Sequence, residues 1–141
     1  MRCCVPRAVR FQEVDAAGIV FFARLFDYAS DALFAAFEAG GIDLSRMFEA
    51  PDVVTPVKRA AALYVAPLRF GDAVEIVAVA ARIEETQYAL GWRVERVEHS
   101  TPEPTRVPAA VVEVAHVAVD PATFRRTALP ERYAAALRAL V

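Results

Sequence analysis

The chain has 141 residues, a formal net charge of −2 and 57% hydrophobic residues. This length suits a single domain spanning residues 1–141, and 16 basic against 18 acidic residues give no basic stripe for binding nucleic acid. No run of about 18 apolar residues occurs, so neither a transmembrane helix nor a membrane partner is expected. The apolar content exceeds what a small monomer usually needs, which predicts a subunit interface.

The beginning of the sequence, MRCCVPRAVRFQEVD, lacks the uninterrupted apolar stretch of a secretory signal. Its two cysteines, Cys3 and Cys4, are adjacent, so they could not staple a fold, and no CxxC metal pattern occurs. We therefore expect a protein of the reducing cytoplasm.

The first half of the chain predicts a strand, a tight turn and one long helix. Residues 8–13 read as a short strand, and DAAG at 15–18 has the composition of a turn. The segment FFARLFDYASDALFAAFEAGG predicts a helix that begins near residues 21–22 and ends at the glycine pair 40–41. Most of this helix is apolar, and its charged residues share one narrow stripe that comprises Arg24, Asp27, Asp31 and Glu38.

The second half predicts four strands and a short final helix. The strands are expected at 53–65, 74–83, 88–97 and 109–119, with loops at 47–52, 67–72 and 98–108 and the helix at 130–140. Consecutive strands joined by short turns imply antiparallel pairing. The order of elements therefore predicts an α+β fold in which an antiparallel sheet curls around one long helix.

The stretch FQEVDAAGIVFF places Asp15 just before the start of the predicted helix. The first N–H groups of a helix have no partner within it, and the helix dipole is positive there. Such donors can hold an oxyanion while a carboxylate activates water or attacks a carbonyl, which is the chemistry of acyl transfer. The alternative is that Asp15 only caps the turn or the helix, and spacing alone favours that alternative.

Other polar residues suggest less chemistry. His116, flanked by alanine and valine in a predicted strand, is expected to be a hydrogen-bonded structural residue, and His99 lies in a loop. Two isolated histidines do not form a metal cluster. No G-x-S-x-G or glycine-rich phosphate loop occurs. The basic residues that could contact phosphates, with plain surface as the alternative for each pair, are Lys58, Arg59, Arg125 and Arg126.

The opening VRFQEVDAAGIVFFARLFDYASDAL resembles that of the 4-hydroxybenzoyl-CoA thioesterase branch of hotdog-fold proteins. TPV at 55–57 and PLRFGD at 67–72 are similar to stretches of related chains, and the specific motif is D-x-A-G-I-V-F-F at 15–22. The resemblance implies a hotdog fold. It also implies a homodimer or homotetramer with active sites at the dimer interface.

The resemblance assigns roles to individual residues. Asp15 matches the family's catalytic carboxylate, as nucleophile or general base, and the N–H of Phe22 matches the donor that polarises the thioester carbonyl. Gly18 matches the glycine that permits a tight approach, and Thr55 matches a polar residue near the acyl group. Ser30 stands where the hydroxybenzoyl enzyme has an aspartate that meets the substrate's phenol. The expected acyl-pocket walls are Phe22, Phe26, Tyr28 and Phe48, and the candidates for holding CoA are Lys58, Arg59, Arg125 and Arg126.

These residues predict an acyl-CoA thioesterase that converts acyl- or aroyl-CoA and water to a free acid and CoA without a metal or organic cofactor. Because Ser30 is neutral, we expect a preference for medium-sized or aromatic acyl groups without a strong demand for a para-hydroxyl. The alternatives are a thioesterase for acyl-carrier protein and a non-catalytic hotdog protein that binds acyl-CoA.

Overall fold

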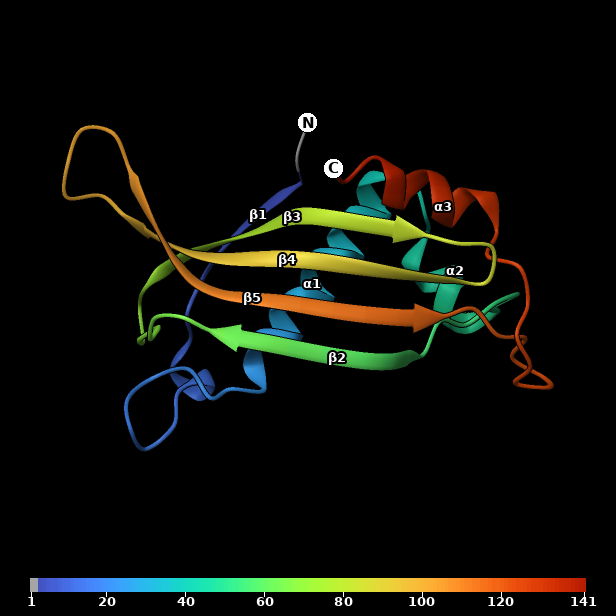
Figure 1. The fold of residues 1–141 in the computed structure, drawn as a ribbon, viewed down its shortest axis with the longest axis horizontal. Coiled ribbons are helices and arrows are strands. Elements are labelled where there is room, and N and C mark those ends of the chain that lie inside the picture. The colour runs from blue at the N-terminus through green and yellow to red at the C-terminus, as the bar shows by residue number, and fades with distance from the viewer. Residues whose placement is uncertain (1–2) are drawn as a thin grey trace.

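The structure is a computed structural model that describes residues 3–141. Within this range five strands form one antiparallel sheet in the order β1-β3-β4-β5-β2 (Figure 1). The elements are β1 Cys4–Ala8, a 3₁₀ turn Phe11–Glu13, α1 Arg24–Ala39, α2 Leu44–Glu49, β2 Val57–Tyr64, β3 Ala73–Ile83, β4 Gln87–Glu98, β5 Thr105–Val117 and α3 Glu131–Arg138.

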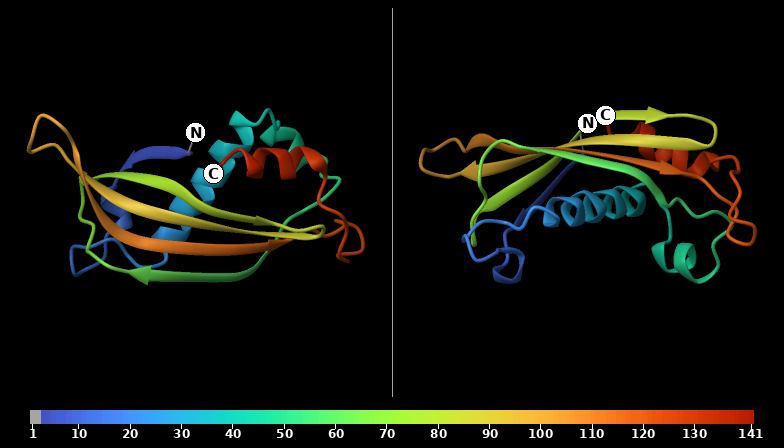
Figure 2. Two further views of the ribbon diagram at one scale, coloured as in Figure 1. Left: turned by 45° about the horizontal axis from the view of Figure 1, so that its top comes forward. Right: turned by 60° about the horizontal axis from the view of Figure 1, so that its bottom comes forward.

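The core lies between one face of the sheet and α1 (Figure 2, right). Strand β4 alternates as its sequence predicts, because Tyr88, Leu90, Trp92 and Val94 are all buried. Three alanines of α1, at positions 29, 32 and 36, are buried as well. Small side chains let the helix lie close to the sheet, so the wide apolar face of α1 is covered. The predicted α+β arrangement is confirmed.

The prediction of a strand at 8–13 is wrong. The first strand is β1, and the chain leaves the sheet after Ala8 to form the 3₁₀ turn. The backbone N–H of Arg10 donates to the carboxylate of Glu13 at 2.8 Å, which closes the turn. Residues 8–13 therefore have the composition of a strand but leave the sheet, because the side chain of Glu13 satisfies a backbone N–H locally.

The other boundaries differ by a few residues, and one helix was not predicted. The predicted loop at 47–52 contains the second half of α2, which begins because the carboxylate of Asp43 accepts the N–H of Arg46 at 3.2 Å. Strand β5 begins at Thr105, inside the predicted loop, and reaches past Pro108 because the sheet changes register there. The helix α1 ends as predicted, with Gly41 in the left-handed region at φ +82°.

Strand β2 lies at the edge of the sheet rather than beside β3, its successor in the sequence. Within residues 3–141 it pairs only with β5, and its other side is open in this part of the chain (Figure 1). Seven of its eight residues are exposed, including Val57, Leu63 and Tyr64. The opposite edge, β1, is short and contains Pro6, which lacks a backbone donor. No helix within residues 3–141 is long and apolar enough to cross a membrane.

Candidate active site

Asp15 lies in a tight turn just before α1. The N–H of Gly18 donates to the Asp15 carbonyl at 2.9 Å, and the N–H of Ala17 donates to Asp15 Oδ1 at 2.8 Å. Gly18 has φ +79°, a conformation that strains other residues. The second carboxylate oxygen accepts no hydrogen bond from residues 3–141, and the side chain is exposed. Asp15 therefore caps the turn with one oxygen and presents the other.

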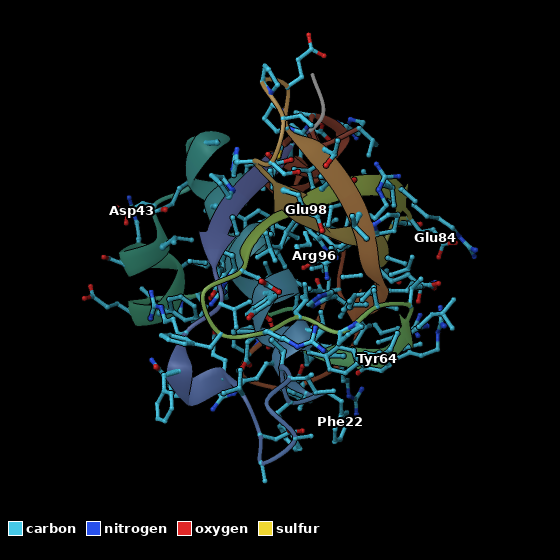
Figure 3. All side chains as sticks on the ribbon, turned by 90° about the vertical axis from the view of Figure 1, so that its left-hand side faces the viewer. Phe22, Asp43, Tyr64, Glu84, Arg96 and Glu98 are labelled. Carbon is cyan, nitrogen blue, oxygen red and sulfur yellow. The ribbon has the colours of Figure 1, made fainter. Side chains whose placement is uncertain are left out.

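Asp15 does not cap the helix. The cap of α1 is Ala23, which offers no side-chain acceptor. The first N–H groups of the helix donate to backbone instead, those of Arg24, Leu25 and Phe26 to the carbonyls of Phe21, Phe22 and Ala23. Among the described residues, none accepts a hydrogen bond from the N–H of Phe22. The carbonyl of Phe22 accepts the hydroxyl of Tyr64 at 2.8 Å, which ties this turn to the end of β2 (Figure 3).

Asp15 and Phe22 line one cavity, which we call the Asp15 pocket. Its volume is about 430 Å³. Its walls come from the turn before α1, the first turn of α1 and the segment after β2, and they include Ile19, Phe21, Leu25, Tyr64, Val65 and Leu68. Asp15 and Phe22 thus line the same mainly apolar pocket, and the backbone N–H of Phe22 has no acceptor among the described residues. A carboxylate that activates water and a backbone N–H that holds an oxyanion are the groups that acyl transfer needs.

A buried carboxylate, Glu13, holds the turn in place. Its exposed fraction is 6%, and it accepts hydrogen bonds from the guanidinium of Arg7 at 2.6 Å and the hydroxyl of Tyr28 at 3.1 Å. Its carbonyl accepts the N–H of Phe21 at 2.9 Å. Glu13 therefore links Arg7 of β1 and Tyr28 of α1 to Phe21, which follows the Asp15 turn. The sequence offered a signal for this role, because an acidic residue in an apolar segment needs a partner.

A second cavity, which we call the Thr55 cavity, lies between α1, α2 and the end of β5. Its volume is about 180 Å³. It brings together three of the predicted substrate-binding residues, Ser30, Phe48 and Thr55. The remaining walls are mostly apolar and comprise Leu33, Phe34, Phe37, Met47, Val53, Val54, His116 and Tyr133.

The Thr55 cavity has a polar end. His116 Nδ1 lies 2.8 Å from the carbonyl oxygen of Thr55, and the ring of His116 stacks on that of Tyr88 with centroids 4.7 Å apart. The hydroxyl groups of Thr55 and Tyr88 are 3.2 Å apart. Burial lowers the pKa of His116, opposed by its bond to Thr55, and burial raises the pKa of Tyr88 to about 12. Both rings are therefore neutral at neutral pH, and His116 makes the structural hydrogen bond that its sequence context predicts.

The two cavities lie at opposite ends of β2. Tyr64, the last residue of β2, lines the Asp15 pocket, whereas Thr55 precedes the first residue of the strand. Eight residues at about 3.3 Å each separate the ends by about 25 Å. Within one chain the predicted catalytic and acyl-binding residues are therefore not brought together.

Two predicted pocket walls lie elsewhere. The side chain of Tyr28 is completely buried in the core, with its hydroxyl on Glu13 and the guanidinium of Arg7 3.7 Å from its ring centre. The ring of Tyr28 therefore faces the core and lines neither the Asp15 pocket nor the Thr55 cavity. Phe26 packs against the core and lines neither the Asp15 pocket nor the Thr55 cavity.

The four basic candidates lie at the end of the sheet where β2 begins. Lys58 donates to the side chain of Gln87 at 2.7 Å, and Arg59 forms an exposed ion pair with Glu113. Arg125 and Arg126 are exposed in the turn after β5. This is the end of the sheet that carries the Thr55 cavity. In residues 3–141 no group of three His, Cys, Asp or Glu side chains is placed to hold a metal ion.

The chain is similar to known proteins along most of its length. The model of the thioesterase-like superfamily matches residues 9–137. A 1,4-dihydroxy-2-naphthoyl-CoA hydrolase from Rippkaea orientalis is 34% identical over 125 residues, 89% of this chain and 87% of that protein. The crystal structure of a 1,4-dihydroxy-2-naphthoyl-CoA thioesterase from Synechocystis superposes with a TM-score of 0.84 at 18% identity, covering 97% and 96% of the two chains. A mutant 4-hydroxybenzoyl CoA thioesterase complexed with 4-hydroxybenzoyl CoA gives 0.77 at 18%, covering 95% and 96%.

Proposed function

Because the chain belongs to the thioesterase-like superfamily, we propose that it hydrolyses aroyl- or acyl-CoA thioesters to a free acid and CoA, with Asp15 as the catalytic carboxylate. The observation that carries this proposal is the shared pocket of Asp15 and the unpartnered N–H of Phe22. The relative from Rippkaea orientalis, named a 1,4-dihydroxy-2-naphthoyl-CoA hydrolase, supports the aroyl-CoA class.

In the proposed reaction, the free oxygen of Asp15 takes a proton from water while the water oxygen bonds to the thioester carbonyl carbon. The negative charge moves to the carbonyl oxygen, where the N–H of Phe22 stabilises it. The carbon–sulfur bond then breaks, and the thiolate of CoA leaves and takes up the proton. In the nucleophilic alternative, Asp15 itself attacks the carbonyl, CoA leaves and water hydrolyses the anhydride. Neither route needs a metal or an organic cofactor.

The proposal includes a homodimer formed through β2. This strand is an open edge with exposed apolar side chains, so a second copy can continue the sheet across it. A twofold axis near Ala60 and Ala61 would make the two β2 strands antiparallel. The Tyr64 end of one subunit would then lie beside the Thr55 end of its partner. The Asp15 pocket of one chain and the Thr55 cavity of the other would form one site at the interface.

The dimer is tested by Leu63→Glu, which puts a charge on the exposed edge strand. We expect the wild-type chain to sediment as a dimer or tetramer at low micromolar concentration, since an obligate interface buries about 2,000 Å² or more. The variant should sediment as a monomer and lose most thioesterase activity. Val79→Glu, an exposed position on β3, is the control and should retain assembly. A fully active monomer would refute the shared site.

The proposed CoA contacts are the basic residues near the start of β2, so the Michaelis constant should depend on salt. Exposed charge pairs weaken as the screening length falls from about 10 Å at 0.1 M to about 3 Å at 1 M salt. We expect the Michaelis constant for acyl-CoA to rise several-fold over this range while the turnover number changes little. The double variant R125Q/R126Q should have a higher Michaelis constant and a shallower salt dependence. A salt-independent Michaelis constant would contradict phosphate binding by these residues.

The function itself is tested by thiol release from short, long and aromatic acyl-CoAs, beside the same acyl groups on acyl-carrier protein. We expect aroyl-CoA to be hydrolysed with the highest specificity constant. Faster release from the carrier protein would favour the carrier-protein alternative. Binding of acyl-CoA without release of thiol would mean that the protein is a non-catalytic binder.

The proposed location is the cytoplasm. Cys3 and Cys4 are both free thiols, as is usual for proteins of a reducing compartment.

A further inference from the structure

The tautomer of His116 is fixed by the structure. The atom 2.8 Å from its Nδ1 is the carbonyl oxygen of Thr55, and a carbonyl oxygen only accepts hydrogen bonds. Nδ1 must therefore carry the hydrogen. In a neutral ring Nε2 is then an acceptor with a free lone pair. No hydrogen bond to Nε2 is formed by any residue between 3 and 141.

The ring of His116 is also fixed in position. It stacks on Tyr88 at an angle of 14° between the ring planes, and it lines the Thr55 cavity beside Ser30 and Thr55. Because the Thr55 hydroxyl lies 3.2 Å from that of Tyr88, one of its hydrogen bonds is already used. The cavity is thus lined by the fixed ring of His116 together with phenylalanine, leucine and valine side chains.

Resting on the proposed function, we infer that His116 is a specificity-determining residue that accepts a hydrogen bond from a hydroxyl group on the ring of an aroyl-CoA substrate. The aromatic ring would lie against the apolar walls of the Thr55 cavity, and its hydroxyl would donate to Nε2. A substrate without that hydroxyl would leave Nε2 desolvated and unpaired, which selects against it. Sequence alone predicted a weak demand for a hydroxyl because Ser30 is neutral, and the acceptor on His116 changes this expectation.

The test compares His116→Asn with wild type on two pairs of substrates: 4-hydroxybenzoyl-CoA with benzoyl-CoA, and 1,4-dihydroxy-2-naphthoyl-CoA with 2-naphthoyl-CoA. The amide nitrogen of asparagine can still donate to the Thr55 carbonyl, so the variant keeps the structural bond while it loses the distal acceptor and the ring stacked on Tyr88. His99→Asn makes the same chemical change in an exposed loop and is the matched control.

For at least one pair, wild type and His99→Asn should prefer the hydroxylated substrate by roughly 5- to 100-fold in kcat/KM, the range expected for one unpaired buried acceptor. His116→Asn should reduce that ratio to near one by losing activity on the hydroxylated substrate alone. An unchanged ratio in His116→Asn, or a wild-type ratio near one for both pairs, would overturn the inference and leave the proposed thioesterase intact.

Binding separates failure of the inference from failure of the function. The thioethers 4-hydroxybenzyl-CoA and benzyl-CoA cannot be hydrolysed at the sulfur, and their affinities are measured by calorimetry. If no thioester is hydrolysed, the proposed function fails. Tighter binding of the hydroxylated thioether to wild type than to His116→Asn still supports the role of His116. Equal affinity of the hydroxylated thioether for wild type and for His116→Asn overturns the role of His116.

Discussion

Asp15→Asn is expected to lower the turnover number for thioester hydrolysis by about 10²- to 10⁴-fold, the usual contribution of a general base, and by more if Asp15 is the nucleophile. The fold should survive, because the carbonyl oxygen of asparagine can still accept the N–H of Ala17 that now binds Oδ1 at 2.8 Å. The change replaces the free carboxylate oxygen with an NH₂ group that cannot take a proton. Activity is measured by thiol release, and folding by thermal unfolding.

The control is Asp72→Asn. Asp72 also closes a turn, since its Oδ2 accepts the N–H of Arg69 at 2.8 Å, but it does not line the Asp15 pocket. The control should retain the wild-type turnover number within about twofold, because a surface change of this kind is close to neutral. If Asp15→Asn is as active as this control, Asp15 is only a turn cap. If Asp15→Asn fails to fold, capping is its main role.

Much of the fold follows from local sequence patterns. The alternation of β4 and the narrow polar stripe of α1 each fix which side is buried, and both predictions are confirmed. The hotdog architecture and the thioesterase family were predicted from the motif at 15–22 and are confirmed by the comparisons. The pairing of β2 was not predictable in this way, because the turn after it does not determine which edge of the sheet it joins.

The candidate site was predictable in parts. The turn at Asp15 could be read from the DAAG composition, and Ser30, Phe48 and Thr55 do share a cavity. The position of Tyr28 was not predictable from helical spacing, because its hydroxyl turns inward to a carboxylate 15 residues away. The partners of His116 were equally hidden, since the Thr55 carbonyl lies 61 residues away and a single sequence does not show which backbone oxygen a ring nitrogen meets.

The buried carboxylate of Glu13 accepts several hydrogen bonds. It accepts from Arg7, from the N–H of Arg10 and from the hydroxyl of Tyr28. Burial, with a further contribution from Glu13, raises the pKa of Tyr28, so its phenol remains a donor. Arg7 has a second partner in the exposed carboxylate of Asp31 at 2.9 Å, but its Nε is buried without an acceptor among residues 3–141. Glu13 is therefore the more buried of the two partners of this partly buried guanidinium.

Glu13→Ala is expected to destabilise the fold by about 3–5 kcal/mol, because breaking a buried ion pair leaves an uncompensated charge. At roughly 3–4 °C per kcal/mol for a domain of this size, the melting temperature should fall by about 10–20 °C. The measurement is thermal unfolding at one fixed protein concentration, since assembly also shifts the melting temperature.

The control for this prediction is Glu98→Ala, which removes the partly exposed partner of Arg96, 2.8 Å away. A surface ion pair contributes about 0–1 kcal/mol, so this variant should lose no more than about 4 °C. Glu13→Gln keeps the shape and should lie between the two in stability, while its weaker hold on Arg7 loosens the turn that carries Asp15. Its turnover number should fall even where the protein is fully folded. The reason is that a looser turn displaces the backbone carbonyl of Glu13, which accepts the N–H of Phe21, next to the proposed oxyanion donor. Equal melting temperatures for Glu13→Ala and Glu98→Ala would show that the buried pair contributes no more than a surface one.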